Sequence, residues 1–222
     1  MRTRPFASLA TLEAGTNYPY ASLIAAATSA DGSPILLISR LAWHTRNLEA
    51  DPRATILFAA DESAADPLDS GRVGVMGTAE RIDDPLIRAR FLARHPKAAL
   101  YADFGDFAFW RLSVERAHFV GGFGRIFTLS AAQLLIDPEA AAAWDAAIGS
   151  VIETVNRDCA EIVARLAALK SGEGGEWRLA ACDPDGCDLV LGERSLRIVF
   201  KEPLSSPSQA IASLYALAEG AV

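Results

Sequence analysis

Residues 39–53 combine the side chains best suited to hold an anionic ligand. Six of them form the candidate binding site: Ser39, Arg40, Leu41, His44, Thr45 and Arg46. Apolar runs predicted as strands flank the segment, so a hydroxyl, an imidazole and two guanidiniums are expected near one end of a sheet. Guanidinium and hydroxyl donors bind phosphate through directional, charge-assisted hydrogen bonds. The segment therefore predicts a site for a phosphate-bearing cofactor.

The same residues also fit a purely structural interpretation. In that interpretation Arg46 pairs with Glu49 or Asp51 on the surface, and His44 caps a helix. The spacing alone does not choose between the two. Asn47 is expected to satisfy local backbone groups, because a short amide side chain competes well for them.

Arg72 and Arg111, each on a predicted strand, complete the set of candidate cofactor-binding residues. The aromatic residues beside Arg111 favour a barrel core or a subunit interface over stacking on a cofactor. His118 precedes Gly121-Gly122-Phe123-Gly124, where glycines allow close approach of a planar ligand or a partner, or simply form a tight turn. His95 stands at a helix end, which favours a capping role. No acid–base residue stands out in a defined pocket, so the sequence assigns no catalytic residue.

Composition limits the classes of function. The 222 residues are 51% hydrophobic and 22% charged, which indicates a well-buried globular core. The formal charge of −7 and the dispersed basic residues argue against a nucleic-acid or anionic-membrane surface. No apolar run reaches the ~20 residues that span a bilayer. We therefore expect a cytoplasmic protein.

The three cysteines, Cys159, Cys182 and Cys187, lack a paired C-x-x-C spacing. Neither a disulfide framework nor a four-cysteine zinc site is indicated, and free thiols are expected.

Short strands separated by turn signals fill the first 132 residues. Residues 20–29 and 34–39 flank Asp31-Gly32 and predict the hairpin that opens the fold. A helix is predicted between Asp84-Pro85 and His95-Pro96. Gly74 and Gly77 indicate a bulge or the close approach of another backbone or a ligand. Further strands are predicted over 54–60, 72–81, 107–114, 117–120 and 126–129, and such a series suggests a small closed barrel.

The composition changes at Asp137 to an alanine-rich, helix-favouring stretch. Residues 141–169 predict one long helix or two nearly collinear ones, ended by the glycines of 171–175. Three short strands, 177–181, 188–191 and 195–200, and a closing helix over 207–218 follow. The second domain is thus predicted as α-β-β-β-α over residues 137–222.

The order of these elements and motifs resembles the flavin mononucleotide (FMN)-binding split barrels related to pyridoxamine 5′-phosphate oxidase. Within them it is most similar to the HugZ-type haem-utilisation branch, which carries a C-terminal α/β domain. The motifs that carry the resemblance are the Ser39–Leu48 string, Asp51-Pro52-Arg53, residues 72–77, Asp106-Phe107 with Arg111, and residues 121–124.

The resemblance implies an α+β protein with an N-terminal antiparallel split β-barrel over residues 1–132, followed by the small α/β domain. It also implies a homodimer with the cofactor in a cleft between protomers, and a flavin held by the positions Ser39–Arg46. The flavin would carry the hydride or electron transfer. The leading hypothesis is therefore an FMN-dependent oxidoreductase acting on an unidentified small substrate.

Two alternatives remain open. HugZ-type relatives bind and degrade haem, with an axial histidine from the C-terminal part, whereas all three histidines of this chain precede residue 119. The histidine-containing helical motif of these relatives corresponds to residues 154–159, which contain no histidine. Iron ligation would then fall to His118, His44 or a cysteine. The other alternative is a cofactor-free dimeric interaction module.

Overall fold

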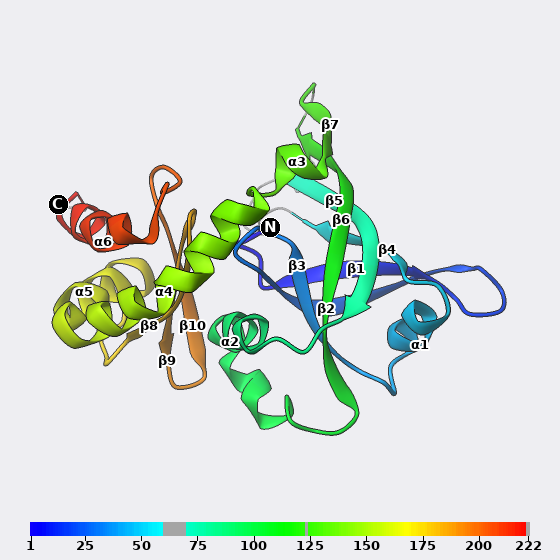
Figure 1. The fold of residues 1–222 in the computed structure, drawn as a ribbon, viewed down its shortest axis with the longest axis horizontal. Helices are drawn as coiled ribbons and strands as arrows, with labels where there is room; N and C mark the ends of the chain where they lie inside the picture. The colour runs from blue at the N-terminus through cyan, green and yellow to red at the C-terminus, as the bar shows by residue number, and fades with distance from the viewer. Residues whose placement is uncertain (60–69, 123, 221–222) are drawn as a thin grey trace.

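A six-stranded antiparallel barrel forms the first half of the chain. The computed structural model describes residues 1–59, 70–122 and 124–220. The barrel strands are β1 (Phe6–Leu12), β2 (Pro19–Thr28), β3 (Pro34–Ser39), β4 (Arg53–Phe58), β5 (Gly71–Arg81) and β6 (Phe107–Gly121). They follow the order β3-β2-β1-β4-β5-β6, and pairing of β3 with β6 closes the barrel (Figure 1). The predicted fold class is confirmed; Ala60, the end of the strand predicted over 54–60, lies outside the described residues.

The barrel interior is apolar because alternate strand residues point inward. Along β1, Ala7, Leu9 and Thr11 are buried, whereas Phe6, Ser8 and Ala10 are exposed. Helix α1 (Trp43–Ala50) covers one end of the barrel and adds Leu48 to the core. The candidate turn therefore lies at a barrel end.

Two strand predictions were wrong. The fold opens with β1, which pairs with both β2 and β4, and not with the hairpin at 20–39. The strands predicted over 107–114 and 117–120 are one strand, β6. The β5–β6 register shifts between Met76 and Gly77, so that Glu115 has no partner on β5.

Gly77 lies at this bulge, as the glycine spacing predicted. A Cβ added to it would lie 2.0 Å from the Ser113 carbonyl oxygen, a distance that no side chain tolerates. The close approach of β6 therefore requires glycine at this position.

Helix α2 (Pro85–Arg94) packs on the outside of the barrel. Asp84 caps it by accepting a hydrogen bond from the Leu86 amide at 2.8 Å, as the Asp-Pro start predicted. The helix buries Ile87 and Phe91 against Ile35 and Leu37 of β3. A short 3₁₀ helix (Pro96–Leu100) follows, and after β6 come β7 (Ile126–Ser130) and α3 (Ala131–Leu134).

The C-terminal part is a three-stranded sheet covered by helices. Its elements are α4 (Pro138–Asp158), α5 (Ala160–Ser171), β8 (Arg178–Asp183), β9 (Gly186–Leu191), β10 (Arg194–Val199), a 3₁₀ turn (Pro207–Gln209) and α6 (Ala210–Glu219). The sheet order is β10-β9-β8. The helix predicted over 141–169 is two helices that meet at Cys159. Within the described residues, no helix is both long and apolar enough to cross a membrane.

Helix α2 also connects the barrel to the C-terminal part, which lie on its two sides (Figure 1). Arg90 donates to the Cys182 carbonyl at 3.1 Å and pairs with Asp145 at 2.6 Å. Arg94 pairs with Asp188 of β9 at 3.2 Å. One helix face is therefore apolar toward the barrel, and another is cationic toward the second sheet.

Candidate functional site

The hydroxyls of the candidate turn are engaged within the protein. Ser39 Oγ donates to Asp106 Oδ2 at 2.6 Å and accepts from the Leu41 amide at 3.1 Å. Thr45 Oγ1 donates to the Ser39 carbonyl at 2.6 Å. Because a hydroxyl has only one hydrogen to donate, neither group is a spare donor for a phosphate in this conformation. Their role in this structure is to fix the turn between β3 and α1.

The side chains that the turn exposes are of another kind. Arg40 and Arg46 are exposed, and neither pairs with an acidic group among the described residues. Leu41 and Trp43 beside them are 69% and 56% exposed. Two available guanidiniums next to two apolar side chains suit an amphipathic anion. The alternative pairing of Arg46 with Asp51 is not seen, since Asp51 instead binds Arg53 at 2.5 Å.

His44 and Asn47 face the inside of this barrel end. His44 Nδ1 lies 3.0 Å from Ser22 Oγ, and burial lowers the pKa of the imidazole. The predicted helix-capping role is not seen, because α1 has Ala42 at its N-cap and no side-chain cap. Asn47 has the predicted structural role, but its partners are not the predicted local backbone groups: it accepts from the Ala14 amide and donates to the Thr11 hydroxyl, both more than 30 residues away.

The structure places Arg111 and Arg72 away from the turn. Ser39 pairs with Phe107 of β6, so Arg111 is four residues further on, roughly 13 Å along the strand. It pairs with Asp31 of the β2–β3 turn at 2.7 Å. Arg72 pairs with Val120, near the opposite end of β6. The roles predicted for these residues stay predictions, and only Ser39–Arg46 form one group.

A second polar group lies on the outer wall of the barrel and was not predicted as a unit. A hollow of about 320 Å³ is lined by residues of five strands, with Arg53 and Arg116 among them. Register pairing aligns Ala10, Thr55, Met76 and Arg116 in one row. Arg116 is exposed and makes no ion pair with the described residues. This wall therefore presents the Arg116 guanidinium next to the shorter side chains of the neighbouring strands.

His118 lies in the next row of the same wall. That row runs across five strands as Leu23, Ser8, Leu57, Gly74 and His118. His118 is exposed, and a Cβ added to its neighbour Gly74 would meet only a Thr55 methyl group at 3.7 Å. An imidazole thus stands beside open backbone, roughly 7 Å along β6 from Arg116. The sequence signal that could have identified the pair of Arg116 and His118 is their alternation around the apolar Ala117.

The remaining ligand candidates are buried. All three cysteines are buried, and burial raises the pKa of Cys182 to about 12 and that of Cys187 well above its ordinary value. Thiolate ligation therefore does not fit Cys182 and Cys187. His95 donates from Nε2 to the Ala26 carbonyl at 2.9 Å and packs against Phe91. Within the described ranges no three His, Cys, Asp or Glu residues gather as a metal site.

The buried histidines predict a loss of stability in mild acid. Burial is the largest cause of the lowered pKa of His95, with Arg94 acting in the same direction. The unfolded chain takes up a proton near pH 6.5, whereas the folded protein resists it. The free energy of unfolding should therefore be highest above pH 6.5 and fall from there toward the lower folded pKa, by less than about 1.4 kcal/mol per pH unit and per histidine.

Urea denaturation at a series of pH values between 5 and 8 measures this slope. His95→Gln, which can keep the bond to Ala26, should flatten it, and His44→Gln should flatten it further. A slope unchanged in both variants would assign the acid sensitivity to other groups.

Comparison with known proteins adds to this geometry. Residues 1–121 match the family model described as pyridoxamine 5′-phosphate oxidase. A 113-residue stretch, 50% of this chain, is 39% identical to the chloroplastic non-canonical heme oxygenase HOZ of Arabidopsis thaliana. It spans only 34% of that protein's length.

Two solved structures match nearly the whole chain. A protein of unknown function from Agrobacterium tumefaciens str. C58 is 32% identical, with a TM-score of 0.75 over 97% of this chain and 90% of that one. A heme binding protein from Mycobacterium smegmatis is 31% identical, with a TM-score of 0.57 over 99% of this chain and 93% of that one.

Proposed function

We propose that this chain, which belongs to the pyridoxamine 5′-phosphate oxidase family, is a haem-binding protein that acts as a homodimer. The observation that carries the proposal is the 31% identity to a heme binding protein over 99% of the chain, C-terminal part included. The 39% identity to a heme oxygenase over half of this chain supports the same cofactor.

The outer wall of the barrel supplies residues that fit a haem. His118 is the exposed histidine, and Gly74 leaves room for a planar ring beside it. Arg116 offers a guanidinium for one propionate carboxylate, and Arg53, which Asp51 binds through Nε and Nη2, has Nη1 left for the other. A bound haem supplies one-electron and oxygen chemistry, while the protein residues bind and orient it.

The end of α4, which corresponds to the histidine-containing motif of the HugZ-type relatives, does not fit a role in ligating iron. Asn156 exchanges two hydrogen bonds with the Leu179 backbone, at 2.8 and 2.9 Å. Cys159 is buried where α4 meets α5. Both side chains hold the helix onto its own sheet, which leaves His118 as the better iron ligand.

A second copy of the chain is the proposed partner for this wall. Leu23 and Leu57 are 75% and 40% exposed there, and the small residue Ser8 lies between them in the row. Exposed leucines on a flat face of small residues are typical of protein interfaces. Sedimentation velocity should give a dimer, and a monomer at micromolar concentration would contradict this part of the proposal.

Flavin mononucleotide is the second candidate cofactor, with an oxidoreductase role toward a small substrate. Arg40 and Arg46 support it, because both guanidiniums are available to a phosphate. The cytoplasmic location predicted from the sequence stays a prediction.

Absorbance spectra after separate incubation with haemin and with flavin mononucleotide test the proposal. We expect a sharp Soret band that survives removal of free haemin. His118→Ala should weaken haemin binding by roughly 10- to 100-fold, as loss of a metal-site residue does, while His44→Ala should not.

A Soret band unchanged by His118→Ala would exclude His118 as the iron ligand. An equal loss of haemin binding in both variants would indicate general damage to the fold. A retained two-banded flavin spectrum without a Soret band would overturn haem in favour of the flavin. No band with either cofactor would favour a cofactor-free module.

A further inference from the structure

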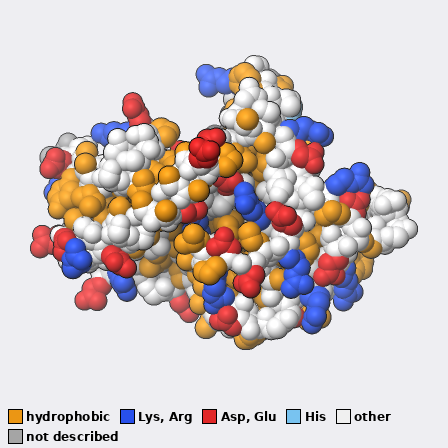
Figure 2. All heavy atoms as spheres, viewed as in Figure 1, with side chains coloured by type: hydrophobic (Ala, Val, Ile, Leu, Met, Phe, Trp, Pro, Cys, Tyr) orange, Lys and Arg blue, Asp and Glu red, His pale blue; other side chains and the backbone are white. Residues whose placement is uncertain are grey.

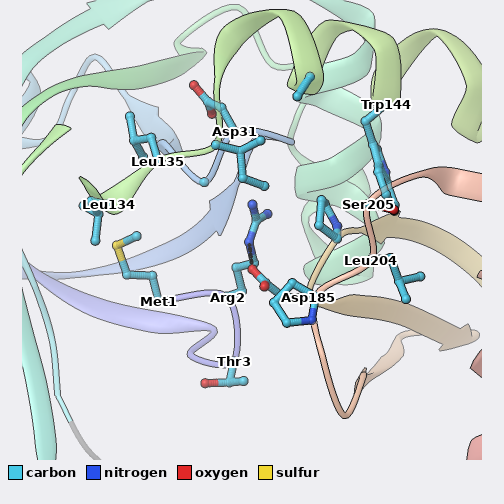
Figure 3. Close-up of a pocket in the computed structure, with 15 residues that line it drawn as sticks. Met1, Arg2, Thr3, Asp31, Leu134, Leu135, Trp144, Asp185, Leu204 and Ser205 are labelled. Atoms are coloured by element: carbon cyan, nitrogen blue, oxygen red, sulfur yellow. Dashed lines mark ion pairs between the residues drawn. The ribbon is translucent and has the colours of Figure 1, made fainter. Parts of the chain in front are cut away.

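A cavity of about 570 Å³ lies between the barrel and the C-terminal part. Figure 3 shows Leu134, Leu135 and Met1 on one side of it, Trp144, Leu204 and Ser205 on the other, and Arg2 between them. A volume of this size falls within the range of sites for small organic ligands, and such sites often lie between domains. It is separate from both the candidate turn and the outer barrel wall, whose residues do not line it.

The walls of the cavity are apolar. Leu134, Leu135 and Ile136 line it from the barrel side, and Trp144, Pro203 and Leu204 from the C-terminal side. The Trp144 indole N–H donates to the Cys182 carbonyl at 3.0 Å, so its polar atom is already satisfied. Atoms around an open apolar space lose dispersion contacts that an apolar ligand would restore.

The charged residues of the cavity are mostly engaged by other groups of the protein. Arg2 donates to the carbonyls of Ser29 and Ala30, and its Nε lies 2.7 Å from Asp185 Oδ2. The Asp31 carboxylate is bound by Ser33 and Arg111. The charges are therefore balanced, which favours a neutral ligand over an ion.

Asp185 is the exception. Its side chain is 44% exposed, and only Oδ2 is engaged by Arg2. No hydrogen bond reaches Oδ1 from the described residues. A carboxylate oxygen accepts hydrogen bonds, so the cavity has an acceptor available for a ligand N–H or O–H group.

We propose that this cavity binds a small neutral apolar molecule whose N–H or O–H group donates to Asp185. The ligand would contact both halves of the chain, since each contributes one wall. Its binding should therefore raise the stability of the folded protein by mass action. The proposal does not depend on the haem assignment, because it concerns other residues.

The fluorescent amine N-phenylnaphthylamine is the probe, because it is apolar, neutral and has one N–H donor. The full-length protein should bind it saturably at one site, with a rise in fluorescence. Phenylnaphthalene, which lacks the N–H group, should compete about tenfold more weakly, as loss of a hydrogen bond to a charged group predicts.

Filling the cavity tests its location. Ala140 is exposed in the first turn of α4 and lines the cavity, whereas Ala143 is exposed on the same helix and does not. Ala140→Phe should weaken probe binding at least tenfold, and Ala143→Phe should leave it unchanged. Ser205→Trp fills the cavity from the other wall and serves as a second variant if Ala140→Phe does not fold. Absence of saturable binding to the unmodified protein, or binding that both filling variants retain, would overturn the proposal.

Discussion

Replacement of Asp183 by alanine should lower the free energy of unfolding by about 3–5 kcal/mol. Asp183 is only 3% exposed, and it binds Arg197 at 2.6 Å and Arg2 at 3.3 Å. Burial alone would raise the pKa of its carboxyl, but Arg197 and Arg2 outweigh burial and lower it. The alanine variant would leave the Arg197 guanidinium buried with only Asp188, at 3.1 Å, as an ionic partner.

Urea unfolding followed by circular dichroism measures this cost. Asp103→Ala is the matched control, because Asp103 also pairs with an arginine, Arg88 at 3.0 Å, but is largely exposed. Removal of a surface ion pair should cost less than about 1 kcal/mol. An equal loss of unfolding free energy in the two variants would show that the ion pairs of Asp183 with Arg2 and Arg197 are hydrated in solution. They would then contribute little to holding the barrel and the C-terminal part together.

Replacement of Phe91 by alanine should also cost about 3–5 kcal/mol, for a different reason. Phe91 is fully buried in α2 and contacts Phe109 edge-on, with ring centres 5.7 Å apart. Truncation would open a cavity between the helix and the barrel. Arg90 and Arg94 of the same helix bind the C-terminal part. We therefore expect looser packing of α2 on the barrel to weaken the ion pairs Arg90–Asp145 and Arg94–Asp188 as well.

The control for Phe91 is Leu86→Ala, on the same helix but 47% exposed. It should cost well below 1 kcal/mol, because little apolar area is lost to water. Thermal unfolding of both variants at one pH gives the comparison. A cost below about 1 kcal/mol for Phe91→Ala would contradict the close packing of α2 on the barrel.

Local sequence signals predicted most of the elements. Asp31-Gly32 marked a turn that the structure confirms, with Gly32 at φ 99°, and Asp84-Pro85 marked the start of α2. Strand β1 was missed because its inward and outward residues differ little in polarity, with alanine on both faces. The series of strands suggested a closed barrel, but β3 and β6, which close it, are about 70 residues apart, and periodicity cannot reveal which strands pair over such a distance.

The candidate site was predicted only in part for the same reason. Residues 39–46 were identified because they are consecutive. The partner that engages the Ser39 hydroxyl, Asp106, is 67 residues away. Figure 2 shows that Lys and Arg side chains mix with Asp and Glu on the viewed face, so charge clustering gave no guide there. The wall with Arg116 and His118 needed the strand register, which depends on Glu115.

Glu115 lines the same hollow as Arg53 and Arg116, and its place in the register decides which way Arg116 and His118 face. Before it, the even-numbered Trp110 and Leu112 point into the barrel; after it, the odd-numbered Ala117 does. The extra residue thus reverses the phase of β6 halfway along its length. If Glu115 were paired in the ladder and the bulge were absent, the phase set by Trp110 and Leu112 would continue, turning Ala117 to the solvent and directing Arg116 and His118 into the apolar interior. One unpaired residue in the backbone therefore separates a barrel wall that can carry cationic chemistry from one that cannot.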